Sequence, residues 1–173
     1  MPLSDEDMYR IMGPTSMSPD ELGKVKKTNP KAYYSWEHFH VLVNEIKKQV
    51  KTVPDIIVSI GKGGSIPGVI LAEGYGVNNL NIGLKSYDKQ DRGKIEEYQS
   101  LPYNESLKDM NILLVDDIAD SGSTFTYTLN KLKEYFCDKV QTASVFYKPC
   151  SKFKPDYIGL EVDADTWVVQ PWE

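Results

Sequence analysis

The chain has 173 residues, of which 40% are hydrophobic and 26% are charged, and its formal net charge is −5. This length and balance suit one globular domain with a sizeable core, and the acidic charge argues against a general binder of nucleic acid or of anionic membranes. Cys137 and Cys150 have neither metal-ligand spacing nor a disulfide framework, so we interpret both as reduced cysteines without a chemical role. No apolar stretch approaches the roughly 18 residues of a membrane span, and the acidic N-terminus does not resemble a signal peptide, so we expect a cytoplasmic protein.

The first third of the chain contains a predicted extension, one helix and one strand. Residues 1–31 are rich in proline, serine and charged residues without an apolar period, so we expect an irregular extension with one short helix near residues 20–27. From Ser35, which can cap a helix, apolar residues recur every three or four positions up to Val50. The apolar run at residues 56–60 then has the length of a buried strand.

Strands and helices are predicted to alternate through the rest of the core. Residues 61–64 are rich in glycine and interrupt the apolar run, and we expect a helix over residues 65–73 with Pro67 in its first turn. Residues 87–109 are polar and indicate a long mobile loop or a small hairpin. The remaining predicted elements are strands at residues 80–86, 112–115 and 140–147 and a helix at residues 123–136. This order predicts an α/β protein with a mostly parallel sheet flanked by helices.

The most informative segment is residues 112–124, where a buried strand runs into carboxylates and then into a turn of small and hydroxyl residues. Backbone amides at a helix N-terminus lack partners and carry partial positive charge, so they bind phosphate well. Gly122 permits a tight turn there, and the hydroxyls of Ser121, Ser123 and Thr124 add donors around the same anion. The segment is not a Walker loop, because no lysine followed by serine or threonine comes after its glycine.

Asp116 and Asp117 lie just before this turn, at the carboxyl edge of the predicted sheet, where α/β proteins bind ligands. Two adjacent carboxylates there can accept hydrogen bonds from sugar hydroxyls and help to hold a divalent cation. The alternative is a capped helix after a strand, with solvated aspartates of no chemical role. A third carboxylate, Asp120, and the dense run of hydroxyl residues favour ligand binding.

Residues 115–124, with the sequence VDDIADSGST, resemble the signature of type I phosphoribosyltransferases. In that family two acids flank the ribose of phosphoribosyl pyrophosphate, and the loop that follows wraps its 5-phosphate. The usual Asp-Thr-Gly is Asp-Ser-Gly here, which keeps the hydroxyl group. The resemblance covers about residues 33–173 and implies the type I phosphoribosyltransferase fold, with Mg²⁺ as cofactor, Asp117 as its ligand and Asp116 as a second candidate ligand.

The resemblance also implies a diphosphate-binding loop after the first core strand, and residues 59–68 (SIGKGGSIPG) occupy that place. Gly63 and Gly64 let backbone amides approach a diphosphate, and Lys62 supplies a cation where relatives commonly carry arginine. A tight turn without a ligand is the alternative.

A third predicted site for phosphoribosyl pyrophosphate opens the polar segment at residues 87–109. Lys85, Ser86 and Tyr87 resemble the start of the mobile catalytic loop that closes over pyrophosphate in this family. Such a lid shields an oxocarbenium-like transition state from water. The alternative is a solvated loop without a role.

The tail resembles that of the xanthine–guanine phosphoribosyltransferases in particular, where it forms a hood over the purine. Lys148 ends the last predicted core strand and is expected to hydrogen-bond to the purine O6. Trp167 is expected to stack on the base at ~1–3 kcal/mol, beside Val168, whereas Trp172 is expected to be a packing or interface residue. The predicted organisation is therefore an extension at residues 1–31, a core at residues 32–150 and a small C-terminal hood at residues 151–173.

These features together predict a purine phosphoribosyltransferase that joins guanine or xanthine, with hypoxanthine as a further candidate, to phosphoribosyl pyrophosphate. Asp120 is expected to meet N7 of the base and assist proton removal, with Lys148 as the second catalytic residue. The expected partners are the two substrates, without nucleic acid or membrane, and the family implies a homodimer or homotetramer. Two alternatives stay open: a non-catalytic regulator that senses phosphoribosyl pyrophosphate, and a transferase that prefers hypoxanthine or another base.

Overall fold

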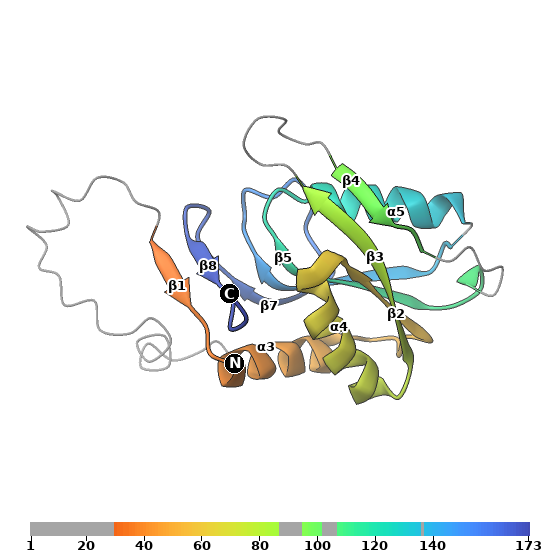
Figure 1. Cartoon of the computed structure of the whole chain (residues 1–173). Coiled ribbons are helices and arrows are strands. Elements are labelled where there is room, and N and C mark those ends of the chain that lie inside the picture. Colours follow the sequence, from red (N-terminus) through yellow and green to blue (C-terminus); the bar gives the residue numbers. More distant parts are fainter. Residues whose placement is uncertain (1–29, 87–94, 102–106, 136) are drawn as a thin grey trace, which may run out of the picture. The chain divides into compact units, whose positions relative to one another are not determined.

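The computed structural model describes residues 30–86, 95–101, 107–135 and 137–173 (Figure 1). The predicted helix near residues 20–27 lies outside these ranges. In chain order the elements are β1 (Lys31–Tyr33), α3 (Trp36–Gln49), β2 (Ile56–Ile60), α4 (Gly61–Tyr75), β3 (Asn78–Ser86), β4 (Ile95–Gln99), β5 (Ile112–Ala119), α5 (Ser123–Glu134), β6 (Val140–Tyr147), β7 (Tyr157–Glu161) and β8 (Trp167–Val169). Among the described residues, no helix has the length and apolar character that crossing a bilayer requires.

A six-stranded sheet in the order β4-β3-β2-β5-β6-β7 forms the centre of the larger compact unit, residues 42–164. Its neighbouring strands run parallel except for β4, which pairs antiparallel with β3. The mostly parallel α/β fold predicted from the sequence is therefore confirmed. The chain adds β3 on one side of β2 and later β5 on the other, so the order of strands reverses between β2 and β5. Open α/β sheets bind ligands outside the carboxyl ends of their strands at such a switch point.

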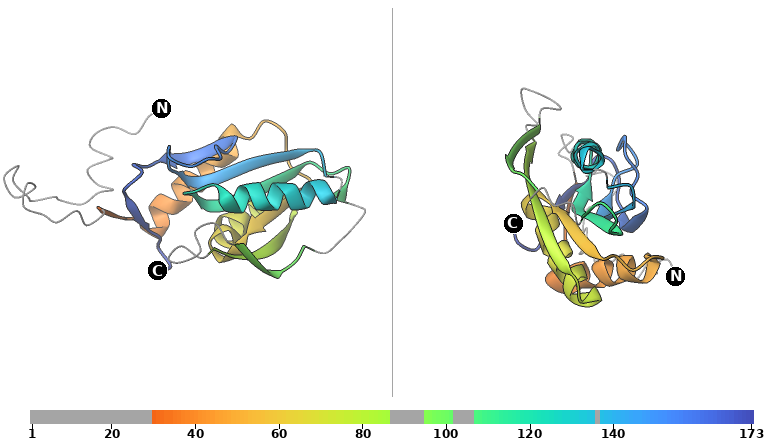
Figure 2. Two further views of the ribbon diagram at one scale, coloured as in Figure 1. Left: turned by 90° about the horizontal axis from the view of Figure 1, so that it is seen from above. Right: turned by 90° about the vertical axis from the view of Figure 1, so that its right-hand side faces the viewer.

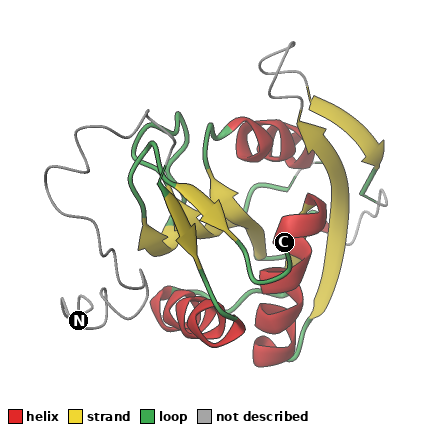
Figure 3. Ribbon diagram, turned by 60° about the vertical axis from the view of Figure 1, so that its left-hand side comes forward, coloured by secondary structure: helices red, strands yellow, loops and turns green. Residues whose placement is uncertain are grey.

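Helices cover both faces of this sheet, with α5 on one face and with α4 and the second half of α3 on the other (Figures 2 and 3). All five residues of β2 and the first five of β5 are buried. Strands covered on both faces need apolar side chains in both directions, which explains their continuous apolar runs.

Residues 30–41 and 165–173 are the described part of a second compact unit. In it β1 and β8 form a parallel two-stranded sheet, with Ala32 opposite Val168. Trp172 packs edge to face on Phe39, with ring centroids 5.0 Å apart, and its centroid lies 5.8 Å from that of Trp36. The predicted packing role of Trp172 is confirmed.

Several predicted elements agree closely with the structure. Ser35 caps α3 as expected, since its Oγ accepts a hydrogen bond from the amide of His38 at 3.2 Å. Strands β2 and β6 have the predicted bounds. In the predicted polar segment, β4 pairs antiparallel with β3, which precedes the segment, whereas residues 87–94 and 102–106 lie outside the described ranges.

The structure corrects three of the predicted features of the core. α4 begins at Gly61 rather than at residue 65, so the glycine-rich residues form its first turn and Pro67 lies in the second. β5 does not end before Asp116 but continues to Ala119, because it stays paired with β6 over that length. The strand before Lys148 is not the last of the core, because β7 from the tail pairs in parallel with β6.

Candidate active site

A pocket of about 260 Å³ lies at the carboxyl ends of β2 and β5, the two strands at the switch point. Its walls are the first turn of α4, the end of β5 and the turn that precedes α5. The predicted site residues that it brings together are Lys62, Gly63, Asp116, Asp117, Asp120, Ser121, Gly122 and Thr124. The two motifs found in the sequence, about 50 residues apart, therefore form one site.

The first turn of α4 packs directly against the end of β5. A Cβ atom at Gly63 would lie 2.4 Å from a carboxylate oxygen of Asp117, and one at Gly64 would lie 2.7 Å from a backbone carbonyl oxygen of β5. A side chain at Gly63 would therefore displace the Asp117 carboxylate, and one at Gly64 would displace the strand end. Gly61, with a φ of 59°, turns the chain from β2 into the helix. The backbone N–H groups of this first turn lack intrahelical partners and give the helix end a partial positive charge.

The two adjacent carboxylates differ in environment. Asp116 is buried, and its oxygens accept hydrogen bonds from the amide of Asp117 at 3.0 Å and from the hydroxyl of Thr124 at 3.1 Å. Burial raises the pKa of Asp116 well above its ordinary value, and the neighbouring charge of Asp117 raises it further. Asp117 is half-buried, and its Oδ1 accepts a hydrogen bond from the amide of Ile118 at 2.9 Å. The Thr124 hydroxyl, expected to face a phosphate, donates to Asp116 instead.

The turn before α5 is tightly supported by its neighbours. Gly122 has a φ of 80°, and a Cβ atom there would lie 2.6 Å from Phe153. Ser121 accepts a hydrogen bond from the amide of Ser123 at 3.3 Å and donates its own hydroxyl to the Ser123 hydroxyl at 3.1 Å. Gly122 at the N-cap has no side chain to satisfy the amides at the start of α5, so apart from the Ser123 amide, which donates to Ser121, these amides can face a bound anion.

Lys148 and Asp120 form an ion pair beside the pocket. The Lys148 Nζ lies 3.2 Å from Asp120 Oδ1, with the lysine residue only 8% exposed and the aspartate side chain 60% exposed. The backbone amide of Lys148 donates to the carbonyl of Ala119 at 3.1 Å. Because β5 and β6 end side by side, residues 28 positions apart present their charges at one place.

The other predicted site residues are not among those that line the pocket. Lys85 is exposed near the end of β3, Ser86 is the last residue of that strand, and Tyr87 lies outside the described residues. In the smaller unit Trp167 is 56% exposed on β8, whereas Val168 is buried. Their placement as a hood over a base stays a prediction.

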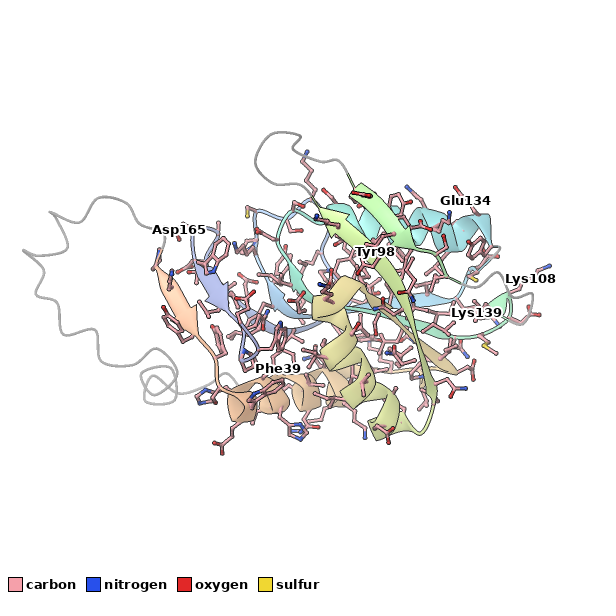
Figure 4. The ribbon with its side chains drawn as sticks, in the orientation of Figure 1. Phe39, Tyr98, Lys108, Glu134, Lys139 and Asp165 are labelled. Atoms are coloured by element: carbon pink, nitrogen blue, oxygen red, sulfur yellow. The ribbon has the colours of Figure 1, made fainter. Side chains whose placement is uncertain are left out.

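A second cavity, of about 570 Å³, opens where β6 and β7 begin, on the opposite edge of the sheet. Its polar groups satisfy one another, since the Tyr157 hydroxyl donates to the side chain of Gln141 at 2.6 Å and Gln141 donates to the carbonyl of Thr52 at 3.1 Å. Lys139, labelled near that edge in Figure 4, directs its ammonium to the carbonyl of Asp109 at 3.3 Å. Although it is larger, this cavity is lined by no helix N-terminus among the described residues, and its charged residues are only Lys51 and Asp156.

Within the described residues, no three His, Cys, Asp or Glu side chains gather into a metal-binding cluster. The carboxylate pair suits a different kind of cation site, because Mg²⁺ commonly takes one or two carboxylates and completes its shell with water and substrate phosphate oxygens. Of the two carboxylates, the half-buried Asp117 is more accessible to a cation than the buried Asp116.

Sequence reasoning missed Asn81, whose side chain on β3 contacts the first turn of α4. Its neighbourhood in the sequence, NNLNIG, contains no motif, and only the alternation of side chains along β3 places Asn79 and Asn81 on one face. The sequence also does not predict the ion pair of Lys148 with Asp120, although it indicates each residue as a candidate catalytic residue.

Comparison with known proteins identifies the family. The model of the phosphoribosyl transferase domain matches residues 31–173. A purine phosphoribosyltransferase from Pyrococcus horikoshii Ot3 superposes with a TM-score of 0.74 at 28% identity, over 83% of this chain and 94% of that one. A xanthine-guanine-hypoxanthine phosphoribosyltransferase from Helicobacter pylori gives a TM-score of 0.66 at 29% identity, over 83% and 94%. A hypothetical protein from Neisseria gonorrhoeae with bound ppGpp gives a TM-score of 0.69 at 25% identity, over 86% and 92%.

Proposed function

Because this chain belongs to the phosphoribosyl transferase family, we propose that it transfers the phosphoribosyl group of phosphoribosyl pyrophosphate to N9 of guanine or xanthine. Hypoxanthine is the third candidate base. The products are the nucleoside monophosphate and pyrophosphate, a reaction of purine salvage. The chain is an enzyme of the purine phosphoribosyltransferase kind, as its relatives are.

The ion pair of Lys148 and Asp120 is the observation that carries the choice of base. A 6-oxopurine presents O6, an acceptor, next to N7 along one edge of its rings. Lys148 supplies a permanent donor and Asp120 an acceptor, 3.2 Å apart beside the pocket. The pair therefore matches that edge, whereas the 6-amino group of adenine would set donor against donor. The relative from Neisseria gonorrhoeae, whose bound ppGpp is a guanine nucleotide, is in keeping with guanine.

Each end of phosphoribosyl pyrophosphate has a complementary group in the pocket. The amides of residues 121–124 suit the 5-phosphate, and the first turn of α4 with Lys62 suits the diphosphate. Asp116 and Asp117 suit the hydroxyls of the ribose, which lies between the 5-phosphate and the diphosphate. Lys85 to Tyr87 are proposed to cover the diphosphate. In the smaller unit, Trp167 and Val168 are proposed to cover the base.

The chemistry proposed for these residues is mostly positioning and electrostatic stabilisation. As the bond from C1 of the ribose to the diphosphate breaks, purine N9 attacks C1 from the opposite face. Lys148 holds the O6 carbonyl, and Asp120 accepts the proton that the base loses at N7. Asp117 would hold Mg²⁺ together with substrate oxygens, and the ion would supply positive charge beside the leaving diphosphate.

A non-catalytic regulator that senses phosphoribosyl pyrophosphate is a less favoured reading. Such a protein needs the phosphate-binding turns but has no use for a base-recognising ion pair, and the net charge of −5 is unfavourable for nucleic acid. The relatives from Pyrococcus horikoshii Ot3 and Helicobacter pylori, both named as transferases, also support an enzyme.

The test is a spectrophotometric assay of guanine, xanthine, hypoxanthine and adenine with phosphoribosyl pyrophosphate and Mg²⁺. We expect turnover of at least one 6-oxopurine and negligible turnover of adenine. The double variant Asp116→Asn/Asp117→Asn should fold, melt no lower than the wild type and show no turnover, because nearly isosteric changes preserve the packing but remove both carboxyl groups. Wild-type turnover by a normally folded double variant would contradict the placement of the ribose and the metal.

A further inference from the structure

The first turn of α4 is held by side chains as well as by its own backbone. Asn81 of β3 donates its side-chain amide to the carbonyl oxygen of Gly61 at 2.7 Å and to the hydroxyl oxygen of Ser65 at 2.7 Å. The Ser65 hydroxyl in turn donates to the same Gly61 carbonyl at 2.7 Å. A single carbonyl, at the residue where strand turns into helix, therefore accepts two side-chain hydrogen bonds.

The partners of Asn81 determine which way its amide faces. Gly61 and Ser59 offer carbonyl oxygens at 2.7 and 3.3 Å, and carbonyl oxygens only accept. The proton of Ser65 is directed to Gly61, so its oxygen is the acceptor toward Asn81. All three contacts require the NH₂ group on this side of the amide. Asn81 is thus a donor to the turn.

This turn has little preference of its own for helix. Three of its first four residues are glycine, which is among the poorest helix formers. Ile60 at the N-cap provides no side-chain cap, and Pro67 has no N–H to donate to the carbonyl of Gly63. Support from outside the helix is therefore needed to keep the turn helical, and the bond from Asn81 supplies it.

The held carbonyl also sets the direction of the next amide. In a trans peptide the C=O group and the following N–H group point in opposite directions, and the described residues contain no cis peptide bond. With the Gly61 carbonyl directed to Asn81 and Ser65, the N–H of Lys62 is turned away from them, at the helix end that lines the pocket. Fixing one carbonyl thus presents the amide that a diphosphate would contact.

We propose that Asn81 is a positioning residue for diphosphate binding: it holds the first turn of α4 in the conformation that presents its backbone N–H groups to the ligand. This proposal rests on the proposed function. Asn81 acts through the turn and has no assigned contact with the 5-phosphate or the base. Its loss therefore affects ligands that carry the diphosphate and spares ligands that lack it.

The test compares Asn81→Ala with Asn79→Ala, a matched control on the same strand whose side chain accepts from Ser59 at 2.6 Å and does not contact the turn. Calorimetry in Mg²⁺ measures the affinities for pyrophosphate and for GMP, and thermal melts check folding. Asn81→Ala should weaken pyrophosphate binding by on the order of 10-fold, the scale of one lost hydrogen bond, and leave GMP affinity unchanged. Asn79→Ala should change neither affinity.

Ser65→Ala removes the second donor to the same carbonyl and should weaken pyrophosphate binding in the same direction. This variant carries the test if Asn81→Ala does not fold. Equal loss of both ligands, or an equal effect of the Asn79 variant, would overturn the positioning role and leave the proposed function standing. A wild-type protein that binds neither pyrophosphate nor GMP would refute the proposed function and this proposal together.

Discussion

Replacing Lys148 by methionine tests the recognition of the base and separates it from stability. The lysine is 8% exposed, so methionine keeps the buried stem packed and removes only the ammonium group. The lost ion pair should change the free energy of unfolding by only ~0–1 kcal/mol, because the Asp120 side chain is 60% exposed and water solvates it readily. We therefore expect a melting temperature close to that of the wild type.

The effect on catalysis should be much larger. A hydrogen bond from a charged donor contributes about 1.5–3 kcal/mol, which corresponds to a loss of about 10- to 150-fold in kcat/KM for guanine. Adenine should remain a poor substrate, since removing the donor adds no acceptor for its amino group.

Steady-state assays of guanine and adenine with the wild type and with Lys148→Met measure these changes. Lys152→Met, which removes an exposed lysine from the same segment after β6, is the control. Unchanged kcat/KM for guanine in Lys148→Met, or comparable wild-type efficiency with adenine, would refute the assignment of Lys148 to O6.

Three further changes test other parts of the site. Because the pKa of Asp116 is raised above its ordinary 3.8, the folded protein holds a proton that the unfolded chain releases, and stability falls as pH rises through that interval. Asp116→Asn should lack this fall, so in denaturant titrations its free energy of unfolding should increase relative to that of the wild type from pH 4 upward. Parallel curves of stability against pH would contradict the burial argument. Asp120→Ala should lower turnover by roughly 10²- to 10⁴-fold while calorimetry shows little change in affinity for phosphoribosyl pyrophosphate, and an equal loss of both would count against a role at the base. Trp167→Ala should weaken GMP binding by ~1–3 kcal/mol without affecting phosphoribosyl pyrophosphate, and equal GMP affinities would exclude stacking.

Local patterns in the chain were sufficient to predict the alternation of strands and helices and the pocket's main residues. An apolar run of strand length marks β2 because both faces of this strand are buried. The segment at residues 115–124 is recognisable because phosphate binding requires small residues, hydroxyls and carboxylates in one short order. These features depend on neighbours in sequence, so they can be read from the sequence.

Features that depend on partners distant in the chain could not be read in this way. The glycines at residues 61–64 have poor helix propensity and were expected to form a loop, but Asn81 from the next strand and the close packing of Gly63 on Asp117 make them the first turn of α4. Likewise β5 runs on past Asp116 because β6 continues to pair with it, and Lys148 meets Asp120 only because those two strands end side by side. Each outcome is set by hydrogen bonds and contacts across the sheet, whose free energy exceeds the local preference of the residues involved.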